Sequence, residues 1–333
     1  MKFSLKTRTA ALVACLMTSG AVLAHGVTYD KRPEGVRLIQ TLEKEHGVDP
    51  ARARAILSDA AYQQSVIDKM SRPAEKRLTW SDYRPIFVQP DRAQDGAAFV
   101  RKHRALFERA EAEYGVPAHI ISAIVGVETR YGAFIGKDRV LDALATLGFD
   151  YPPRAKFFYG QLGDFIRLSA EEDIDPNTAV GSYAGAMGLP QFIPSSYLAY
   201  AVDFNDNGKR DLWNEPADII GSVANYFAEH GWRRDEPVAD KALDQAIESA
   251  LERSRRETRY RYADLAAQDI RVSAAPAADF PVGLVELETT EGPEFWVGYH
   301  NFFVITDYNH SRMYAMAVFQ LGELIRQNLA EEG

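Results

Sequence analysis

Glu128 is the residue whose type and spacing most clearly indicate chemistry. It falls on a predicted helix over residues 117–131, where Ile121, Ile124, Val125 and Glu128 stand at offsets 0, 3, 4 and 7 and so share one face. The residues three and four positions away carry no positive charge, so burial of this carboxylate has no local compensation and should raise its pKa. A carboxyl group that acts as a general acid near neutral pH needs such a raised pKa. A structural carboxylate paired with a distant Arg or Lys fits the same pattern.

A second candidate segment, residues 181–192, reads GSYAGAMGLPQF and is dense in small residues. Small side chains let a ligand or another part of the chain approach the backbone closely, and they also permit tight helix packing. The segment lacks the GK[ST] ending of a phosphate loop and the GxSxG spacing of a nucleophile elbow. Gln191 and Tyr197 are of the types that hydrogen-bond to sugars and stack on them.

A third candidate is an oxygen-rich loop that matches the first part of an EF-hand calcium loop. Positions 1, 3, 5, 6 and 9 are Asp203, Asn205, Asn207, Gly208 and Asp211. Position 7 supplies only a backbone carbonyl, so Lys209 is permitted there. Position 12 is Asn214 instead of a bidentate Glu, so a closing carboxylate must come later in the chain. We expect a structural calcium ion, and the alternative is a plain surface turn rich in Asn, Asp and Gly.

The first 24 residues have the features of a secretory leader. Three cations, Lys2, Lys6 and Arg8, precede an apolar run over 9–23, and small residues lead to a cleavage site after Ala24. We expect export to the bacterial periplasm. A second interpretation is lipidation at Cys15, because LVAC at 12–15 resembles the box at which bacterial lipoproteins are cut.

The composition narrows the classes of function. Cys15 is the only cysteine of 333 residues, so a chain cut after Ala24 has no disulfide, thiolate metal site or cysteine nucleophile. The formal net charge is −9, or −12 without the three leader cations, which argues against nucleic acid as a partner. The histidines show no HExxH spacing, and no dinucleotide or Walker motif is present. An acid-catalysed enzyme or a non-catalytic wall- or calcium-binding protein remains.

The elements that must position these residues are mainly helical, with a small β region late in the chain. Helical patterns cover residues 33–71, 97–114, 133–169, 219–231 and 311–327. Gly47 and Gly115 fit helix ends, Asp49 fits an N-cap, and Pro117 fits a first helical position. The dense mixed charge of 241–256 at helical spacing predicts a solvated face. Short β segments are predicted at 270–272, 284–288 and 294–299, with 302–307 as a further candidate.

Several motifs together resemble the lytic murein transglycosylase B family, glycoside hydrolase family 103. VETRYG at 127–132 resembles its catalytic-helix motif, and the other matches are LDALATL at 141–147, SYAGAMG at 182–188 with Gln191-Phe192, the Asp203 loop, and YNHS at 308–311. They follow the family order from about Tyr83 to Gly322. The resemblance implies a mainly α (α+β) fold, in which a lysozyme-like helical core is joined to another helical region and a small β insertion.

The implied organisation follows the chain. It comprises a signal peptide (1–24), an N-terminal helical region (25–96), a catalytic core (97–232) with an EF-hand-like loop (203–218), a small α/β insertion (233–300), and a C-terminal strand and helix (301–333).

The resemblance further implies cleavage of the β-1,4 bond between N-acetylmuramic acid and N-acetylglucosamine in peptidoglycan, with formation of 1,6-anhydromuramic acid. Glu128 would be the sole catalytic residue, first an acid and then a base toward the muramyl C6 hydroxyl. A two-carboxylate glycosidase needs a second acid, and no matched motif supplies one, so the substrate's own N-acetyl group is expected to assist. A hydrolytic muramidase at the same site and a wall-binding protein with an inactive site are the alternatives.

By matched position, the residues that would shape the sugar sites are Tyr83, Ser182, Gln191, Phe192, Tyr308 and Asn309. Arg154 matches a family arginine that would bind the stem peptide or a muramyl carboxylate, although Pro153 replaces the arginine that often precedes it. The predicted calcium ligands are Asp203, Asn205, Asn207, Lys209 through its carbonyl, Asp211 and Asp218. We expect no cofactor for the chemistry, glycan strands and other wall enzymes as partners, and a monomer.

Overall fold

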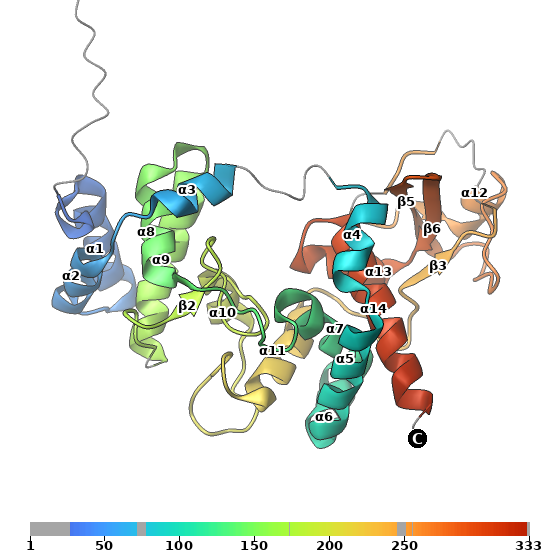
Figure 1. Ribbon diagram of the computed structural model, residues 1–333, viewed down its shortest axis with the longest axis horizontal. Helices are drawn as coiled ribbons and strands as arrows, with labels where there is room; N and C mark the ends of the chain where they lie inside the picture. The colour runs from blue at the N-terminus through green and yellow to red at the C-terminus, as the bar shows by residue number, and fades with distance from the viewer. Residues whose placement is uncertain (1–26, 72–77, 173, 245–250, 255, 332–333) are drawn as a thin grey trace, which may run out of the picture.

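The computed structural model (Figure 1) describes residues 27–71, 78–172, 174–244, 251–254 and 256–331, so the predicted leader and Cys15 lie outside the described residues. The described chain is mainly helical with a small sheet late in the sequence, as predicted. Up to residue 150 the helices are η1 (Tyr29–Lys31), α1 (Pro33–His46), α2 (Pro50–Asp59), α3 (Gln64–Ser71), α4 (Trp80–Phe87), α5 (Pro90–Lys102), α6 (Arg104–Tyr114), α7 (Ala118–Thr129) and α8 (Val140–Asp150). They are followed by η3 (Pro152–Arg154), α9 (Ala155–Glu171), α10 (Pro194–Tyr200), α11 (Pro216–Glu229), α12 (Tyr262–Ala266), α13 (His300–Tyr308) and α14 (Arg312–Glu331).

Helix ends follow the local signals of the sequence. Gly47 and Gly115 end α1 and α6 in the left-handed conformation, with φ of 66° and 75°. The Asp49 carboxylate accepts hydrogen bonds from two amides in the first turn of α2. Pro117 was predicted as the first helical residue of α7. It is instead the extended N-cap, and the helix begins at Ala118.

The helices form two groups that the chain visits alternately. Figure 1 shows α1–α3 beside α8 and α9, whereas α4–α7 lie with α13 and α14 on the other side. Helix α10 packs on α9 and on α11, and α11 packs on α6 and α7. The segment predicted as one N-terminal helical region (25–96) is therefore shared between the groups, because α1–α3 belong to the first and α4 and α5 to the second. A single apolar core runs through both.

The small β insertion is a four-stranded antiparallel sheet of order β3-β6-β5-β4, and a second, two-stranded sheet pairs β1 with β2. The strands are β1 (Asp138–Arg139), β2 (Val180–Gly181), β3 (Ala239–Lys241), β4 (Tyr260–Arg261), β5 (Pro281–Thr289) and β6 (Gly292–Gly298). Strands β5 and β6 form a hairpin whose register runs from Gly283 opposite Gly298 to Thr289 opposite Gly292. One face of the hairpin packs into the main core through Val285 and Leu287, and the other covers a separate small core.

Three predictions of secondary structure were wrong. The predicted strand at 302–307, and with it the C-terminal strand of 301–333, is part of helix α13, since a short apolar run does not separate a buried helix from a strand. Residues 270–272 form no regular strand. The helix predicted over 97–114 is divided at His103 into α5 and α6. The described residues of 241–256 form no helix, and most of them are exposed, in line with the predicted solvated face.

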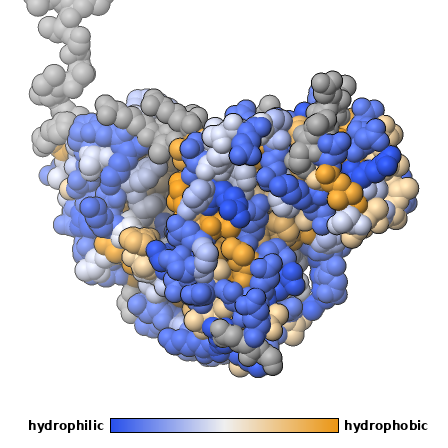
Figure 2. Space-filling view, turned by 45° about the vertical axis from the view of Figure 1, so that its right-hand side comes forward, coloured by the Kyte–Doolittle hydropathy of each residue, from blue (hydrophilic) through white to orange (hydrophobic). Residues whose placement is uncertain are grey.

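The face of the molecule seen in Figure 2 is mostly hydrophilic, and its hydrophobic residues lie in separate patches. Within the described part of the chain, no helix combines the length and the apolar character needed to cross a bilayer.

Candidate active site

Glu128 lies in the last turn of α7, a helix buried along most of its length. Ile121, Ile124 and Val125, the residues predicted to share its face, are completely buried, whereas Glu128 itself is partly exposed. The helix stops at once after this turn, because Arg130 and Tyr131 both adopt positive φ, 49° and 56°. Such values are uncommon outside glycine and are typical of sites where function constrains the backbone. The carboxyl group thus stands at the open end of a rigid apolar helix.

Tyr314, in the first turn of α14, holds this carboxyl group. Its hydroxyl donates a hydrogen bond of 2.6 Å to Oε1 of Glu128. Burial, followed by the charge of Glu128, raises the pKa of Tyr314 well above its usual value, so the phenol keeps its proton. Tyr83 also contributes to the raised pKa of Tyr314, so this predicted sugar-site residue lies near the same carboxyl group.

Tyr308 packs against the same pair. Its ring stacks on Tyr314 with centroids 6.3 Å apart and an angle of 10° between the planes. Burial, and then the Glu128 charge, raises the pKa of Tyr308 well above its usual value. The sequence analysis named Tyr308 but missed Tyr314, which lies 186 positions from Glu128. The only available signal was its place three residues after the matched YNHS motif.

The glycine-rich segment forms a short hairpin. Two residues near Glu128, Thr129 and Tyr308, hold it by hydrogen bonds. Thr129, next to Glu128, donates its hydroxyl to the carbonyl of Leu189 at 3.0 Å, and Tyr308 donates its hydroxyl to the carbonyl of Pro190 at 2.6 Å. Gly188 has φ of 68°, and a Cβ there would lie 2.4 Å from the carbonyl oxygen of Leu212. The small residues of this segment therefore serve close packing of backbone against backbone.

The remaining predicted sugar contacts have structural partners in the hairpin region. The Gln191 amide donates to the carbonyls of Ile135 and Gly188, and the Ser182 hydroxyl accepts from two amides of its own turn. Phe192 is buried against Tyr308, with ring centroids 5.9 Å apart. Asn309 directly follows α13 and Tyr308. The structure thus brings Tyr83, Phe192, Tyr308 and Asn309 into one region with Glu128 and makes Ser182 and Gln191 part of the adjoining hairpin.

Arg154 lies apart from these contacts. It ends η3 on the surface of the first helix group, and its guanidinium lies over the rings of Phe157 and Phe158 at 4.4 and 5.0 Å from their centroids. A contact of Arg154 with a substrate would therefore reach across from the other helix group.

The predicted calcium loop is tightly closed. Asp203 accepts hydrogen bonds from the amides of Asn207 and Gly208, at 3.0 and 2.6 Å, and the oxygen of Asn205 accepts from Asn207. Asp218 is fully buried and accepts from the amides of Phe204 and Asp211, so it joins the two ends of the loop. Burial, reinforced by the charges of Asp203 and Glu215, raises the pKa of Asp218.

The chemical types of the potential ligands in this loop fit calcium. Its members are carboxylate, side-chain amide and carbonyl oxygens, which this cation prefers. Among the described residues no three His, Cys, Asp or Glu side chains gather in a way that could hold a metal, so the amide oxygens of Asn205 and Asn207 are essential to the set. Asp211 turns its carboxylate toward the amides of Trp213 and Asn214.

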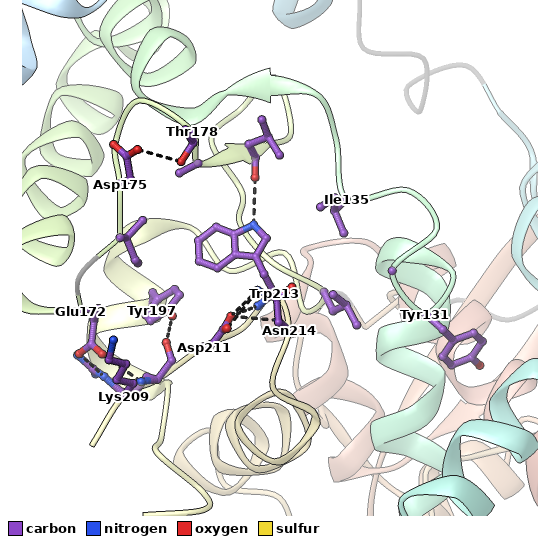
Figure 3. Close-up of a pocket in the computed structure, with 16 residues that line it drawn as sticks. Tyr131, Ile135, Glu172, Asp175, Thr178, Tyr197, Lys209, Asp211, Trp213 and Asn214 are labelled. Carbon is purple, nitrogen blue, oxygen red and sulfur yellow. Dashed lines mark hydrogen bonds and ion pairs between the residues drawn. The ribbon is translucent and has the colours of Figure 1, made fainter. Parts of the chain in front are cut away.

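A cavity of about 650 Å³ separates this loop from the end of α7 (Figure 3). In Figure 3, Tyr131 lies on one side and Lys209 and Asp211 on the other, while the Trp213 ring projects between them. Gly132, Leu189 and Arg210 also line the cavity, and Glu128 is not among its lining residues. Tyr197, a candidate sugar contact in the sequence, is fully buried here and donates its hydroxyl to the carbonyl of Arg210. The Leu189 amide donates to the Leu212 carbonyl at 2.8 Å, so the calcium loop is tied to the hairpin that supports Glu128.

Comparison with known proteins finds similar sequences and structures over most of the chain. A family model described as the transglycosylase SLT domain matches residues 31–323. The membrane-bound lytic murein transglycosylase B of Escherichia coli (strain K12) is 41% identical over 315 residues, which cover 91% of this chain and 86% of that protein.

Two solved structures are similar throughout. The soluble lytic transglycosylase SltB1 of Pseudomonas aeruginosa is 44% identical, with a TM-score of 0.82 over 90% of this chain and 100% of that one. The Escherichia coli lytic transglycosylase Slt35 in complex with calcium is 41% identical, with a TM-score of 0.83 over 91% and 95%. With a shared fold and motifs over nine-tenths of its length, this chain belongs to the lytic murein transglycosylase B family.

Proposed function

We propose that Glu128 is the sole catalytic residue of this peptidoglycan lytic transglycosylase. As an acid it protonates the oxygen of the β-1,4 bond between N-acetylmuramic acid and N-acetylglucosamine, and that bond breaks at the muramyl C1. As a base it then takes the proton of the muramyl C6 hydroxyl, whose oxygen bonds to C1 and closes the 1,6-anhydro ring. The substrate's acetamido group meets the positive charge at C1 between these steps, which spares the protein a second carboxylate.

One observation carries this proposal: the Glu128 carboxyl lies at the open end of a buried helix, with Oε1 fixed by Tyr314. A carboxyl that must act first as acid and then as base has to keep one orientation through both steps. The phenol supplies that orientation without competing for the proton, because its own pKa is raised far above neutral. The ring of Tyr308 stacks on Tyr314 and so supports the phenol that holds the carboxyl group.

We infer that the neighbouring residues bind the glycan strand. Tyr83, Phe192, Tyr308 and Asn309 lie in the region of the carboxyl group, and Ser182 and Gln191 shape the hairpin that borders it. Arg154, on the other helix group, would bind the stem peptide or a muramyl carboxylate. Tyr83 and Phe192 are buried and would support the site from behind, whereas the partly exposed ring of Tyr308 suits the apolar face of a sugar. The polar groups suit the hydroxyl and acetamido groups.

The experiment that tests the reaction is mass spectrometry of the muropeptides released from purified peptidoglycan by residues 25–333 and by Glu128→Gln. We expect products one water lighter than reducing-end sugars, and none from the variant. Products with reducing ends would instead assign a hydrolytic muramidase to the same site, since the two reactions differ only in whether water or the C6 hydroxyl attacks. A variant as active as the parent would remove Glu128 from the mechanism.

We further infer that loop 203–211 holds a structural calcium ion through Asp203, Asn205, Asn207, Asp211 and the carbonyl of Lys209, with Asp218 as the closing carboxylate. The supporting facts are the oxygen donor set of the loop and the calcium complex of the similar Escherichia coli enzyme. The ion would supply no chemistry. It would neutralise carboxylates that now repel each other and so fix the loop against the hairpin.

We propose the cell envelope as the site of action, because the substrate is found there and the leader pattern of residues 1–24 predicts export. Release after Ala24 gives a periplasmic protein. Lipidation at Cys15 would give a membrane-anchored one, and the intact mass of the mature protein distinguishes the two.

A further inference from the structure

A second groove lies in the part of the molecule that holds the small sheet. It has a volume of about 780 Å³ and three walls, formed by the start of α4, by the sheet at β3 and the tip of the β5–β6 hairpin, and by α14. Its central lining residues are Arg84, Lys241, Glu294, Trp296, Phe319 and Gln320. Three elements that are distant in sequence thus converge on one open surface feature.

The groove is separate from the Glu128 site. Both contact α14, but Glu323 stands nine residues after Tyr314, which at 100° per residue is half a turn away on the helix surface. Phe319 and Gln320 lie on the same far side. A ligand in the groove would therefore occupy the face of α14 opposite to the face that holds the Glu128 carboxyl.

Trp296 is the central feature of this groove. The ring is only partly buried, and its edge-to-face contact with Phe319 has centroids 6.2 Å apart. Its ring nitrogen donates to Glu294 at 2.7 Å, and Lys241, bonded to the same carboxylate at 3.0 Å, lies over the ring at 5.9 Å. These contacts fix the orientation of the indole, so a ligand that stacks on it would not have to order it first.

The rim provides charged and neutral hydrogen-bonding groups. Arg84 donates to the side-chain oxygen of Gln320 at 2.6 Å, and Lys241 pairs with Glu294. The amide of Thr290 donates to the Ser81 hydroxyl at 3.0 Å, which fixes the hairpin tip to α4. The lining carries charges of both signs, Arg84 and Lys241 beside Asp240, Glu291, Glu294 and Glu323, so the groove favours a ligand with many hydroxyl groups over one with a strong charge of a single sign. A rigid aromatic surface bordered by such groups suits an N-acetylated sugar chain.

We propose that this groove is an accessory saccharide site that binds glycan of the wall away from the bond being cleaved. The inference rests on the proposed function only in taking peptidoglycan as the polymer. A second weak site on an insoluble polymer raises the effective concentration of the enzyme at the next bond, even if the site contributes nothing to the chemical step. The sheet insertion then retains the enzyme on the wall.

The test measures retention without turnover. Glu128→Gln is sedimented with peptidoglycan from which the stem peptides have been removed, alone and combined with Trp296→Ala or Lys241→Ala. Trp213→Ala is the matched control, because Trp213 is also a partly buried tryptophan that lines a cavity, next to the calcium loop. We expect Trp296→Ala to weaken retention by about tenfold, Lys241→Ala to weaken it by less, and Trp213→Ala to leave it unchanged.

A second readout separates this site from catalysis and from misfolding. In the active enzyme, Trp296→Ala should leave the turnover of a soluble peptidoglycan tetrasaccharide within about twofold of the parent and lower the turnover of intact sacculi. Retention that is unchanged in Trp296→Ala and Lys241→Ala would overturn the proposal. So would retention that disappears when the stem peptides are removed, because the groove would then recognise peptide. Activity that persists in Glu128→Gln would refute the catalytic assignment without affecting this result.

Discussion

A phenol from a distant helix holds the catalytic carboxyl proposed here. Glu128 lies at the end of α7, and the hydroxyl of Tyr314 that orients it comes from α14. Tyr314 is therefore a positioning residue, which acts on the reaction through Glu128. Hydrogen bonds to charged groups contribute about 1.5–3 kcal/mol, so its hydroxyl should matter for the rate.

Tyr314→Phe tests that role. The ring is kept while the 2.6 Å hydrogen bond is lost, so kcat should fall by about one to two orders of magnitude with KM nearly unchanged. Steady-state kinetics on a soluble muropeptide substrate would measure both parameters. Tyr308→Phe is the matched control, because the Tyr308 hydroxyl donates to the Pro190 carbonyl instead of to Glu128. Equal kinetics in Tyr314→Phe and the parent would show that Glu128 needs no such support.

At the scale of elements, the end of α7 depends on two glycines. Tyr131, at φ of 56°, turns back so that its hydroxyl lies against Gly96 of α5 and Gly126 of α7. A Cβ at Gly126 would lie 2.5 Å from that hydroxyl oxygen and 2.8 Å from the ring carbon that bears it. The sharp stop after Glu128 is thus possible only because neighbouring helix positions carry no side chain.

Gly126→Ala should lower the free energy of unfolding by about 1–3 kcal/mol, because the partly buried Tyr131 ring must move to accept the methyl group. Thermal or urea unfolding would measure the loss. Gly160→Ala in α9 serves as the control: nothing lies within 4 Å of a Cβ there, so the same change should be neutral or slightly stabilising. If Gly126→Ala and Gly160→Ala unfolded alike, the packing of Tyr131 would not constrain the end of α7.

The contact between α7 and α14 should also depend on pH. Burial lowers the pKa of His119 to about 4, although Glu323 lies 3.9 Å away and partly opposes the shift. The unfolded chain then binds this proton at higher pH than the folded one, so stability should fall as pH drops from about 6.5 to 4. The loss is at most about 3 kcal/mol, from 1.36 kcal/mol per pKa unit.

Unfolding free energies of the parent and His119→Gln at pH 7, 6, 5 and 4 would isolate this contribution. The parent should lose more stability than the variant, and the difference should grow toward pH 4. Parallel curves would mean that the His119 proton is bound equally in both states.

How far the sequence could predict these elements depended on how local each signal was. The caps Asp49, Gly47 and Gly115 act within a few residues, and the structure confirmed all three. Residues 302–307 of helix α13 were predicted as a strand, because a short apolar run is compatible with either structure. Packing against distant parts of the chain decides that it is helical. Tyr314 was missed for the same reason, because no spacing rule connects residues 186 positions apart.

At the scale of the whole molecule, the calcium loop and the catalytic carboxyl share one support. Asp218 joins the ends of the loop. Just beyond Asp211, the Leu212 carbonyl accepts a hydrogen bond from the Leu189 amide of the hairpin. The carbonyl of Pro190, the residue after Leu189, accepts a hydrogen bond from the Tyr308 hydroxyl. The loop and the hairpin are tightly packed, so ordering the first should order the second. Calcium should therefore stabilise the fold as a whole, including the region around Glu128.

Millimolar calcium should raise the melting temperature by a few degrees, since binding to the folded state alone adds about 2.7 kcal/mol at one hundred times Kd. Differential scanning calorimetry with calcium, with magnesium and with a chelator would measure this. Asp203→Asn should abolish the shift, because its carboxylate begins the loop and faces the amides of Asn207 and Gly208. Asp206→Asn, an equal change of charge at an exposed loop position, should retain it. A shift as large in Asp203→Asn as in the parent would place the ion elsewhere, and no shift in the parent would remove calcium from this loop.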